Sequence, residues 1–397
     1  MGWARTRPLA AFALCYALGL ALGAQGWVSG WLYLGAAGLI LAESLRHRKA
    51  ALAFLAAFFA GAALISIAVH RPPKLPAPGK YVLTGTVITS AANAEGRMTL
   101  LMDGVAFDGE ANGSRVLLYV ANWPGALPER GAGVRASCRV WRTQEESSIS
   151  PFTFRAYTLR QDVYLCASAD PALFRITDPG GPGLMRSLDR LRERAAARVD
   201  GLYAPDMAPL VKALTLGIRS ELPDDMSRAF AGAGMVHLLS ISGLHITILA
   251  GLLYFLIRRT RMPAPAAYAA VLALLILYAA MVGAAASILR SVVMFAALGA
   301  GKLRRRPADT LTSLSASFLA LTLFTPRNIL DPGLLMSYAA ILGILCLAPP
   351  KGWPKFAGLR YRPAKFLRGI AVAACASAGA SLGILPLAAA YGAFNPY

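Results

Sequence analysis

Acidic residues are scarce in this sequence, above all in its apolar segments. Its 397 residues include 20 Asp and Glu against 40 Lys and Arg, and only 15% of the residues are charged. The acids of the apolar segments, Glu43, Asp309 and Asp331, lie near segment ends. Because carriers coupled to protons or sodium ions usually need buried acids, a self-powered antiporter is disfavoured.

Several catalytic signatures are also missing. The sequence has no G-x-x-x-x-G-K-[ST] loop, no H-x-H-x-D-H cluster and no G-x-S-x-G elbow. The stretch from His237 to His245 contains no cysteine or carboxylate, and the whole chain has four histidines, which disfavours a metal site. We therefore expect no enzymatic activity, no metal and no cofactor in this chain.

Apolar residues make up 56% of the sequence, and the mean hydropathy is +0.52, which is typical of a polytopic membrane protein. The first apolar segment is not expected to be a cleaved signal peptide, because a second follows at once. We predict about nine α-helical spans. They cover residues 8–24, 27–42, 51–69, 237–257, 265–283, 287–301, 309–325, 333–348 and 369–390.

Basic residues cluster in alternate loops, at 46–49, 258–261, 302–306 and 351–368. The positive-inside rule puts these loops and the N-terminus in the cytoplasm, with residues 71–180 outside, at the inner membrane of a bacterium. Attraction of a polyanion is the other interpretation of the basic excess. We divide the chain into a three-span segment (1–70), an extracytoplasmic domain (71–180), a connector (181–236) and a second membrane domain (237–397), which we expect to be incomplete at its C-terminus.

Residues 71–180 have the pattern of an all-β domain. Runs at 81–90, 97–107, 114–121, 133–142 and 162–169 are rich in Val, Leu, Thr and Tyr and are separated by turn residues. Five such strands predict an OB-like barrel, a fold that often binds single-stranded nucleic acid through aromatic and basic side chains. The candidate contacts are Tyr119, Trp123, Arg139, Trp141 and Arg142. Packing in the core and at the rim is the alternative role for the aromatic residues.

Two of the five cysteines, Cys138 and Cys166, lie in this domain, each in a predicted strand. An oxidising exterior would permit a disulfide between them, although spacing alone does not establish the geometry. Further on, residues 184–202 predict an amphipathic helix with leucines on one face and arginines on the other. It would lie on the bilayer surface or dock on the membrane helices. Residues 206–233 predict short helices.

The stretch from His237 to His245 places polar and small residues at the start of an apolar helix: His237, Ser240, Ser242, Gly243 and His245. If it is helical throughout, His237, Ile241 and His245 follow one another at intervals of four. Polar groups at membrane depth are costly and usually face the protein interior or a permeant pathway. Close helix packing and a translocation path both remain open as interpretations.

Arg290 is a second polar outlier, about one turn into a short apolar segment. It would reach the outer interface, pair with Asp331 or meet an anionic permeant. Ser337, about a turn and a half beyond Asp331, completes the candidate path.

Several of these stretches resemble the ComEC family of competence proteins. They are Ala213–Ser220, residues 230–246, Gly283–Ser291 and Pro326–Gly333. Residues 335–338, Leu-Met-Ser-Tyr, depart from the family's usual Gln-Leu-Ser-Phe, so of these only Ser337 is transferable.

The resemblance implies an inner-membrane channel for single-stranded DNA in natural transformation, with an extracytoplasmic OB-like domain. It also implies a DNA receptor outside, a helicase-like motor in the cytosol, membrane lipid as surroundings and a homo-oligomer as an option. The nuclease-like domain of many members is absent from these residues. A transporter or flippase for a small anionic or lipid-linked substrate, and a structural assembly protein, are the alternatives.

Overall fold

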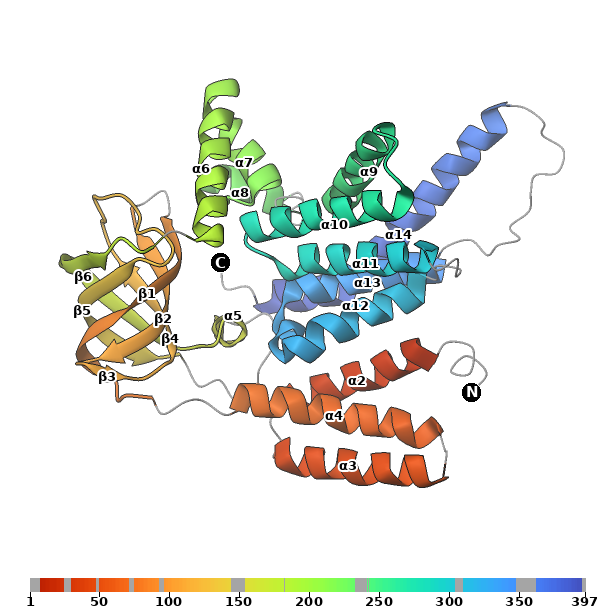
Figure 1. Cartoon of the computed structure of the whole chain (residues 1–397), viewed down its shortest axis with the longest axis horizontal. Helices are drawn as coiled ribbons and strands as arrows, with labels where there is room; N and C mark the ends of the chain where they lie inside the picture. The colour runs from red at the N-terminus through yellow and green to blue at the C-terminus, as the bar shows by residue number, and fades with distance from the viewer. Residues whose placement is uncertain are drawn as a thin grey trace.

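A computed structural model describes residues 8–24, 30–47, 50–70, 75–92, 96–143, 154–181, 183–232, 241, 243–303, 310–347 and 362–394. It contains a β-barrel beside a body of helices, and helices from both ends of the chain contribute to that body (Figure 1). The barrel is thus an insertion between two groups of helices.

Five strands form the barrel, and each of the five predicted strands is confirmed. The strands are β1 (Gly79–Ala92), β2 (Met98–Phe107), β4 (Arg115–Val120), β5 (Gly133–Arg142) and β6 (Val163–Asp178). Their order is β1-β5-β6-β4-β2, and a further pairing of β1 with β2 closes the ring. Among the described strand pairs, β4 and β6 alone run parallel. β3 (Glu110–Ala111) is a short extension paired with β2 that the sequence did not reveal.

Alternation of side chains explains the barrel core. In β5, Val134, Ala136, Cys138 and Val140 are buried inside, whereas Arg139 and other intervening residues face outward. A period of two is the mark of a strand with one buried face. β6 continues to Asp178, well beyond its predicted end, because its second half pairs with the start of β5.

The predicted Cys138–Cys166 disulfide is wrong. Cys138 belongs to the cluster inside the barrel, whereas Cys166 packs outside it with Leu101 and Leu117. The register pairs Cys138 with Ala169 and Cys166 with Trp141, so the two cysteines lie on opposite faces of the sheet. Both are free, and burial raises the pKa of each thiol to about 11.

These two thiols are expected to stay unbridged and unreactive in the folded chain, because both are buried and neutral at neutral pH. Alkylation with iodoacetamide, read by mass spectrometry, should label them only after denaturation. Cys346, which is exposed, is the reactive control. A Cys138–Cys166 bridge in protein made in an oxidising compartment would contradict this expectation.

Each predicted apolar segment contains a helix. The helices are α2 (Pro8–Ala24), α3 (Gly30–His47), α4 (Ala50–His70), α9 (Gly243–Arg259), α10 (Ala264–Met281), α11 (Ala286–Leu303), α12 (Thr310–Phe324), α13 (Pro332–Leu347) and α14 (Arg362–Phe394). By length and composition, two stretches within the described residues, Ala264–Met281 and Ile370–Ala389, are long and apolar enough to cross a membrane. Five further helices carry shorter apolar stretches.

Helices from before and after the barrel share one core. Tyr16 of α2, Ile65 of α4, Phe318 of α12 and Leu334 of α13 belong to the same buried cluster. The Tyr16 hydroxyl donates to the carbonyl of Thr322 on α12 at 3.5 Å. The two predicted membrane segments therefore form one packed body despite the domain inserted between them.

Glycines allow α13 and α14 to approach closely. A Cβ at Gly343, Gly379 or Gly383 would overlap backbone atoms of the facing helix. Small residues at such positions are typical of helix pairs in membranes, where backbone-to-backbone packing replaces the hydrophobic effect.

Five further elements complete the described structure. They are α5 (Phe154–Arg160), α6 (Leu184–Leu202), α7 (Ala208–Leu216), α8 (Asp224–Gly232) and the 3₁₀ turn η2 (Pro326–Leu330). The amphipathic helix predicted at 184–202 is confirmed as α6, and it runs across the direction of α10, α11 and α13 (Figure 1). Its apolar face is covered in part: Leu188 and Val199 are half-buried, whereas Leu184, Leu191 and Leu202 are exposed.

Candidate functional site

The polar motif lies at the start of α9. This helix begins at Gly243, and Ile241 precedes it outside the helix, so the predicted helical spacing of Ile241 with His245 is wrong. His237, Ser240 and Ser242 lie outside the described residues. His245 is half-buried in the first turn of α9, and Thr247 donates to the carbonyl of Gly243 at 2.8 Å.

Gly243 leaves room for the guanidinium group of Arg290. A Cβ built on Gly243 would overlap Nη2 of Arg290 and lie 2.9 Å from Oγ of Ser291. On the same side, Oγ of Ser287 donates to the carbonyl of Ile241 at 3.5 Å. The glycine in the motif therefore has a packing role, which is to let α11 place an arginine against the start of α9.

Arg290 is buried, with 5% of its surface exposed. It donates to Oγ of Ser291 at 3.3 Å and contacts Sδ of Met294 at 3.4 Å, and it lies 5.9 Å from the centre of the Tyr338 ring. Within the described part of the chain, its Nε has no hydrogen-bond partner. The predicted pairing with Asp331 is wrong, because Asp331 binds Arg160 instead, at 2.5 Å.

Tyr338 connects Arg290 to the serines of α12. Its hydroxyl is 2.9 Å from Oγ of Ser317, and its ring meets that of Phe318 edge-on. Ser337 is half-buried next to it. Where the family usually has Phe, Tyr338 thus keeps the aromatic ring near Arg290 and adds a hydroxyl beside Ser317.

Gly243→Ala is expected to lower the free energy of unfolding by about 1–3 kcal/mol, because the new methyl group must displace a buried arginine. Thermal unfolding of the purified chain in detergent measures this loss. The matched control is Gly251→Ala in the same helix, where nothing lies near the added carbon. It should be neutral or slightly stabilising, since alanine favours helix.

A double-mutant cycle makes this test specific. In an Arg290→Met background the cost of Gly243→Ala should fall, because the guanidinium group no longer fills the space. An equal cost in both backgrounds would contradict the contact.

Arg327 joins the barrel to the helices from both ends of the chain. Its Nη2 and Nε donate to the carbonyl of Ala68 on α4, at 2.6 and 3.1 Å. Its Nη2 also donates to the hydroxyl of Tyr164 on β6 at 3.1 Å, and its Nη1 pairs with Asp162 at 2.7 Å. Burial raises the pKa of Tyr164, and the nearby guanidinium group offsets part of this rise.

Asp331 makes a second link a few residues on. One carboxylate oxygen binds Arg160 of α5, and the other accepts from the backbone N–H of Gly333 at 2.8 Å and of Leu334 at 3.3 Å at the start of α13. A capping aspartate is favourable at a helix N-terminus. We call Arg160, Asp162, Tyr164, Arg327 and Asp331 the junction.

Sequence reasoning assigned no role to Arg327. The signal was present, because the predicted topology puts this arginine in an outside loop, where the positive-inside rule does not account for it. Arg327→Ala is expected to lower the unfolding free energy by about 2–3 kcal/mol, because Asp162 and the Ala68 carbonyl lose a charged donor. Calorimetry in detergent should show the loss, and Arg327→Lys should recover only part of it.

Arg175→Ala, an exposed arginine of β6, is the matched control for this change and should leave stability unaltered. Limited proteolysis gives a second measurement, since the loosened barrel of Arg327→Ala should be released sooner. Equal stability and equal cleavage in both variants would contradict the role of the junction.

On the barrel surface, the structure brings together three of the five candidate nucleic-acid contacts. Tyr119 and Trp141 stack with ring centres 6.4 Å apart and planes 13° apart. In the register, Arg139 and Tyr119 flank Ser168 from opposite sides. These side chains form an outward face across β4, β6 and β5, which we call the aromatic face.

The other two candidates lie elsewhere. Trp123 packs against the barrel core, edge-on to Phe174 at 4.8 Å, and its indole N–H donates to the carbonyl of Ala126 at 3.1 Å. The packing alternative therefore applies to Trp123. Arg142 is exposed at the end of β5 and alternates away from Arg139 and Trp141.

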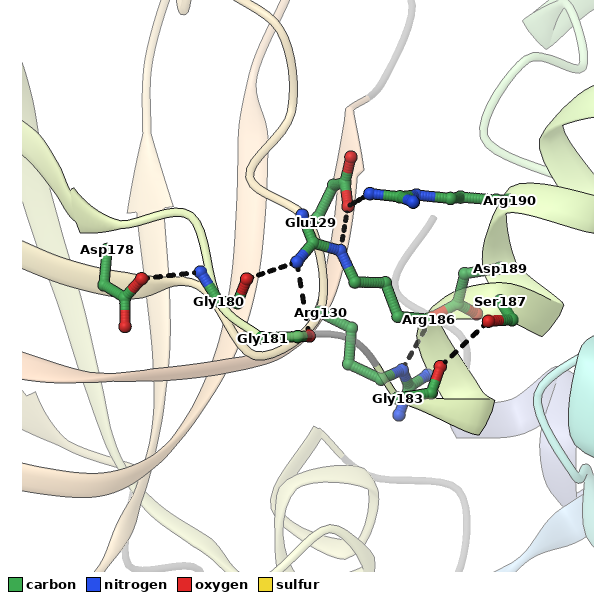
Figure 2. Close-up of polar contacts among 10 residues, drawn as sticks. All are labelled: Glu129, Arg130, Asp178, Gly180, Gly181, Gly183, Arg186, Ser187, Asp189 and Arg190. Carbon is green, nitrogen blue, oxygen red and sulfur yellow. Dashed lines mark hydrogen bonds and ion pairs between the residues drawn. The ribbon is translucent and has the colours of Figure 1, made fainter.

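A network of ion pairs connects the barrel to α6 (Figure 2). Arg186 binds Glu129 and donates to the carbonyl of Gly180 at 2.5 Å, and Arg190 also reaches Glu129, at 3.3 Å. Arg130 pairs with Asp189 at 2.7 Å. The hydrogen bond from Arg186 is the main reason why the pKa of Glu129 lies below its ordinary value.

The far end of α6 is tied to the helical body. Arg192 donates to the carbonyl of Leu216 at 2.8 Å, and the buried Lys212 pairs with Asp200 at 2.7 Å and with Glu221. The Tyr278 hydroxyl of α10 donates to the carbonyl of Thr215 at 2.7 Å. α6 therefore bridges the barrel and the segment that leads into the polar motif.

Comparison with known proteins relates this architecture to competence. Residues 214–396 match the family model described as Competence protein. ComE operon protein 3 of Bacillus subtilis (strain 168) is 29% identical over 213 residues, which are 53% of this chain and 27% of that protein. Competence protein ComA of Neisseria gonorrhoeae is 30% identical over 225 residues, which are 54% of this chain and 32% of that protein. No solved structure matches.

The matched segment defines a competence domain, and a β-barrel precedes it between two groups of helices. Residues 214–396 are a competence domain of the ComEC family. The matched part spans less than a third of the length of each of the two relatives.

Proposed function

We propose that this chain is a multi-pass membrane component for the uptake of single-stranded DNA in natural transformation. The observation that carries the proposal is the aromatic face. Successive bases stack on aromatic side chains, and basic groups nearby bind the backbone, in proteins that hold single strands without sequence preference. Tyr119, Trp141 and Arg139 supply both elements on the barrel that precedes the competence segment.

The polarity of the helical body supports a membrane location. Ser313, Ser315, Ser317 and Thr322 of α12 are buried, whereas large apolar side chains of α9, α10 and α14 are exposed. Two of these hydroxyls illustrate how they are satisfied. Thr322 donates to a carbonyl of its own helix, and Ser317 is hydrogen-bonded to Tyr338. Polar groups inside and apolar groups outside are what a lipid environment selects.

We propose nine spans with the N-terminus in the cytoplasm and the barrel outside the inner membrane of a bacterium. The basic segments 46–49, 258–261, 302–306 and 351–368 then lie together on the cytoplasmic side. The barrel is taken as OB-like on its five strands and its closed ring, and such barrels use the face of strands 2 and 3 for nucleic acid. Tyr119 lies on the third strand of the ring along the chain, β4.

Within the helical body, Gly243, His245, Arg290 and Ser337 remain our candidates for the strand's path. Arg290 would contact a phosphate, because a buried guanidinium group with an unpaired Nε among the described residues favours an anion. Asp331 acts instead in the junction. A carrier for a small anionic or lipid-linked substrate would use Arg290 in the same way, but it would not need the aromatic face.

No catalytic step is assigned to this chain. The driving force for uptake would come from a helicase-like motor in the cytosol, and a receptor outside the membrane would deliver the DNA. Membrane lipid would surround the helices. Self-association of the chain is a further part of the proposal.

Binding of fluorescein-labelled oligo(dT) to the full chain in detergent, followed by anisotropy, tests the proposal. Loss of the stack in Tyr119→Ala/Trp141→Ala is expected to weaken binding, because each base–aromatic stack contributes about 1–3 kcal/mol. The control is Phe154→Ala/Tyr157→Ala, which removes another exposed stacked pair. No binding by the unmodified chain, or equal losses in both variants, would contradict the proposal, as would competition by small anions alone.

A further inference from the structure

A cleft lies between the barrel, α6 and the loop after α7. It has a volume of about 630 Å³ and is lined by residues 88–92 at the end of β1, residues 127–130, one side of α6 and residues 217–221. This volume is within the range of about 300–1,000 Å³ that is typical of small-ligand sites. We call it the seam cleft, because its walls come from the barrel on one side and from the start of the competence segment on the other.

Arginines and acids line the cleft in nearly equal numbers, but most of them neutralise one another. Arg130, Arg186 and Arg190 are engaged with Asp189 and Glu129, and they hold the barrel against α6 (Figure 2). Glu221 is bound by Lys212. The net charge of the cleft therefore depends on the three other charged residues of its lining, which are Arg192, Glu193 and Arg219.

Two guanidinium groups of the cleft form no salt bridge with a described carboxylate, although the charge of Asp189 acts on Arg192 from a longer distance. Arg192 donates only to the carbonyl of Leu216, and within the described ranges it forms no salt bridge. The side chain of Arg219 has neither a hydrogen bond nor an ion pair with any residue that the structure describes, whereas its backbone carbonyl accepts from the N–H of Leu222 at 3.1 Å. Its guanidinium group is reached by solvent, and partial desolvation lowers its pKa without making it neutral at physiological pH. The carboxylate of Glu193 offsets one of these two positive charges.

The backbone of the loop brings the two arginines to the same wall. Gly217 ends α7 in the left-handed conformation, with a φ of 67°, which turns the chain back toward α6. The space beside Gly217 is bordered by Nη2 of Arg192, 3.7 Å from an ideal Cβ. Arg219 follows two residues later, with the hydroxyl of Ser220 next to it as a further donor.

The opposite wall is the end of β1, which leads into the connection between the first two strands. In OB barrels this connection contacts nucleic acid. A strand that leaves such a barrel for the competence segment would therefore pass the two unpaired guanidinium groups, and arginine is suited to phosphate recognition.

We propose that the seam cleft binds the phosphodiester backbone of a single strand through Arg219 and Arg192, as the strand passes from the barrel to the competence segment. This inference rests on the proposed function. It adds a DNA contact between the barrel and the competence segment, where neither the aromatic face nor Arg290 lies.

Opposite charge changes in one cleft test the inference. The probe is fluorescein-labelled oligo(dT), bound to the full chain in detergent at several salt concentrations. Arg219→Ala should weaken binding about 3- to 10-fold at moderate salt and reduce the slope of log affinity against log salt by about 0.7, the value for one single-strand phosphate. Glu193→Gln should tighten binding about 2- to 3-fold, because it removes the carboxylate that competes with the phosphate.

The matched control is Arg194→Ala, which removes an exposed arginine of the same helix that does not line the cleft. It should leave affinity and salt slope unchanged. Melting temperatures of all variants in detergent show whether each is folded. Arg192 is left intact, because its hydrogen bond to Leu216 makes a structural effect inseparable from a binding effect.

An oligonucleotide with an uncharged methylphosphonate backbone identifies the recognised group. With this probe, Arg219→Ala and Glu193→Gln should have no effect. Equal losses in Arg219→Ala and Arg194→Ala, or an unchanged affinity in both cleft variants while oligo(dT) still binds, would overturn the inference and leave the proposed function intact. An effect of Arg219→Ala on binding to phosphatidylglycerol vesicles but not on oligo(dT) would overturn it in favour of a lipid headgroup. Failure of the unmodified chain to bind oligo(dT) would remove the proposed function itself.

Discussion

The contacts of Arg327 hold this molecule together. One guanidinium group bonds the last turn of α4, the entry to β6 and the turn that leads to α13, so three parts of the chain meet at a single planar donor. Arginine suits this role because its donors are fixed in a fork and it stays charged when partly buried. Without this contact, the barrel would be joined to the helices mainly through the Arg160–Asp331 pair, α6 and the ion pairs around Glu129.

The polar interior of the helical body follows a related principle. Lipid-facing surfaces exclude polar groups, so those that a function needs are collected inside, where each must find a partner. α12 satisfies its hydroxyls within its own backbone, whereas Arg290 relies on a serine, a thioether and an aromatic ring. In the function that we propose, this weak set of partners leaves Arg290 able to contact an anion. Gly243 makes the arrangement sterically feasible, because it lets the guanidinium group lie directly against α9.

We propose three contacts for a single strand: the aromatic face of the barrel, the seam cleft and Arg290. Each uses a different kind of interaction, namely stacking, a partly desolvated pair of guanidinium groups and a buried charge. α6 connects the first two, because its arginines both hold the barrel and line the cleft. Arg186 and Arg190 of α6 are engaged in ion pairs that hold the barrel, whereas Arg219, in the loop after α7, is in no described ion pair and is the arginine proposed to bind an anion.

Much of the secondary structure could be read from the sequence, because hydropathy and side-chain periodicity are local properties. The five main strands, the amphipathic helix at 184–202 and a helix in each apolar segment were predicted in this way. The aromatic face was anticipated in part, since alternation along β5 already puts Arg139 and Trp141 on the same side of the strand. The family, too, was recognised from local motifs, and the competence match confirmed it.

What depended on contacts between distant segments could not be read in this way. Asp331 binds Arg160 rather than Arg290, Trp123 packs in the core, and Cys138 and Cys166 lie on opposite faces of the barrel. Each outcome is decided by strand register or helix packing across many residues, which no local pattern encodes. The sequence therefore determined the elements, their polarity and the family. The tertiary structure decided which charges neutralise one another and which remain free, because pairing requires two side chains to meet in space.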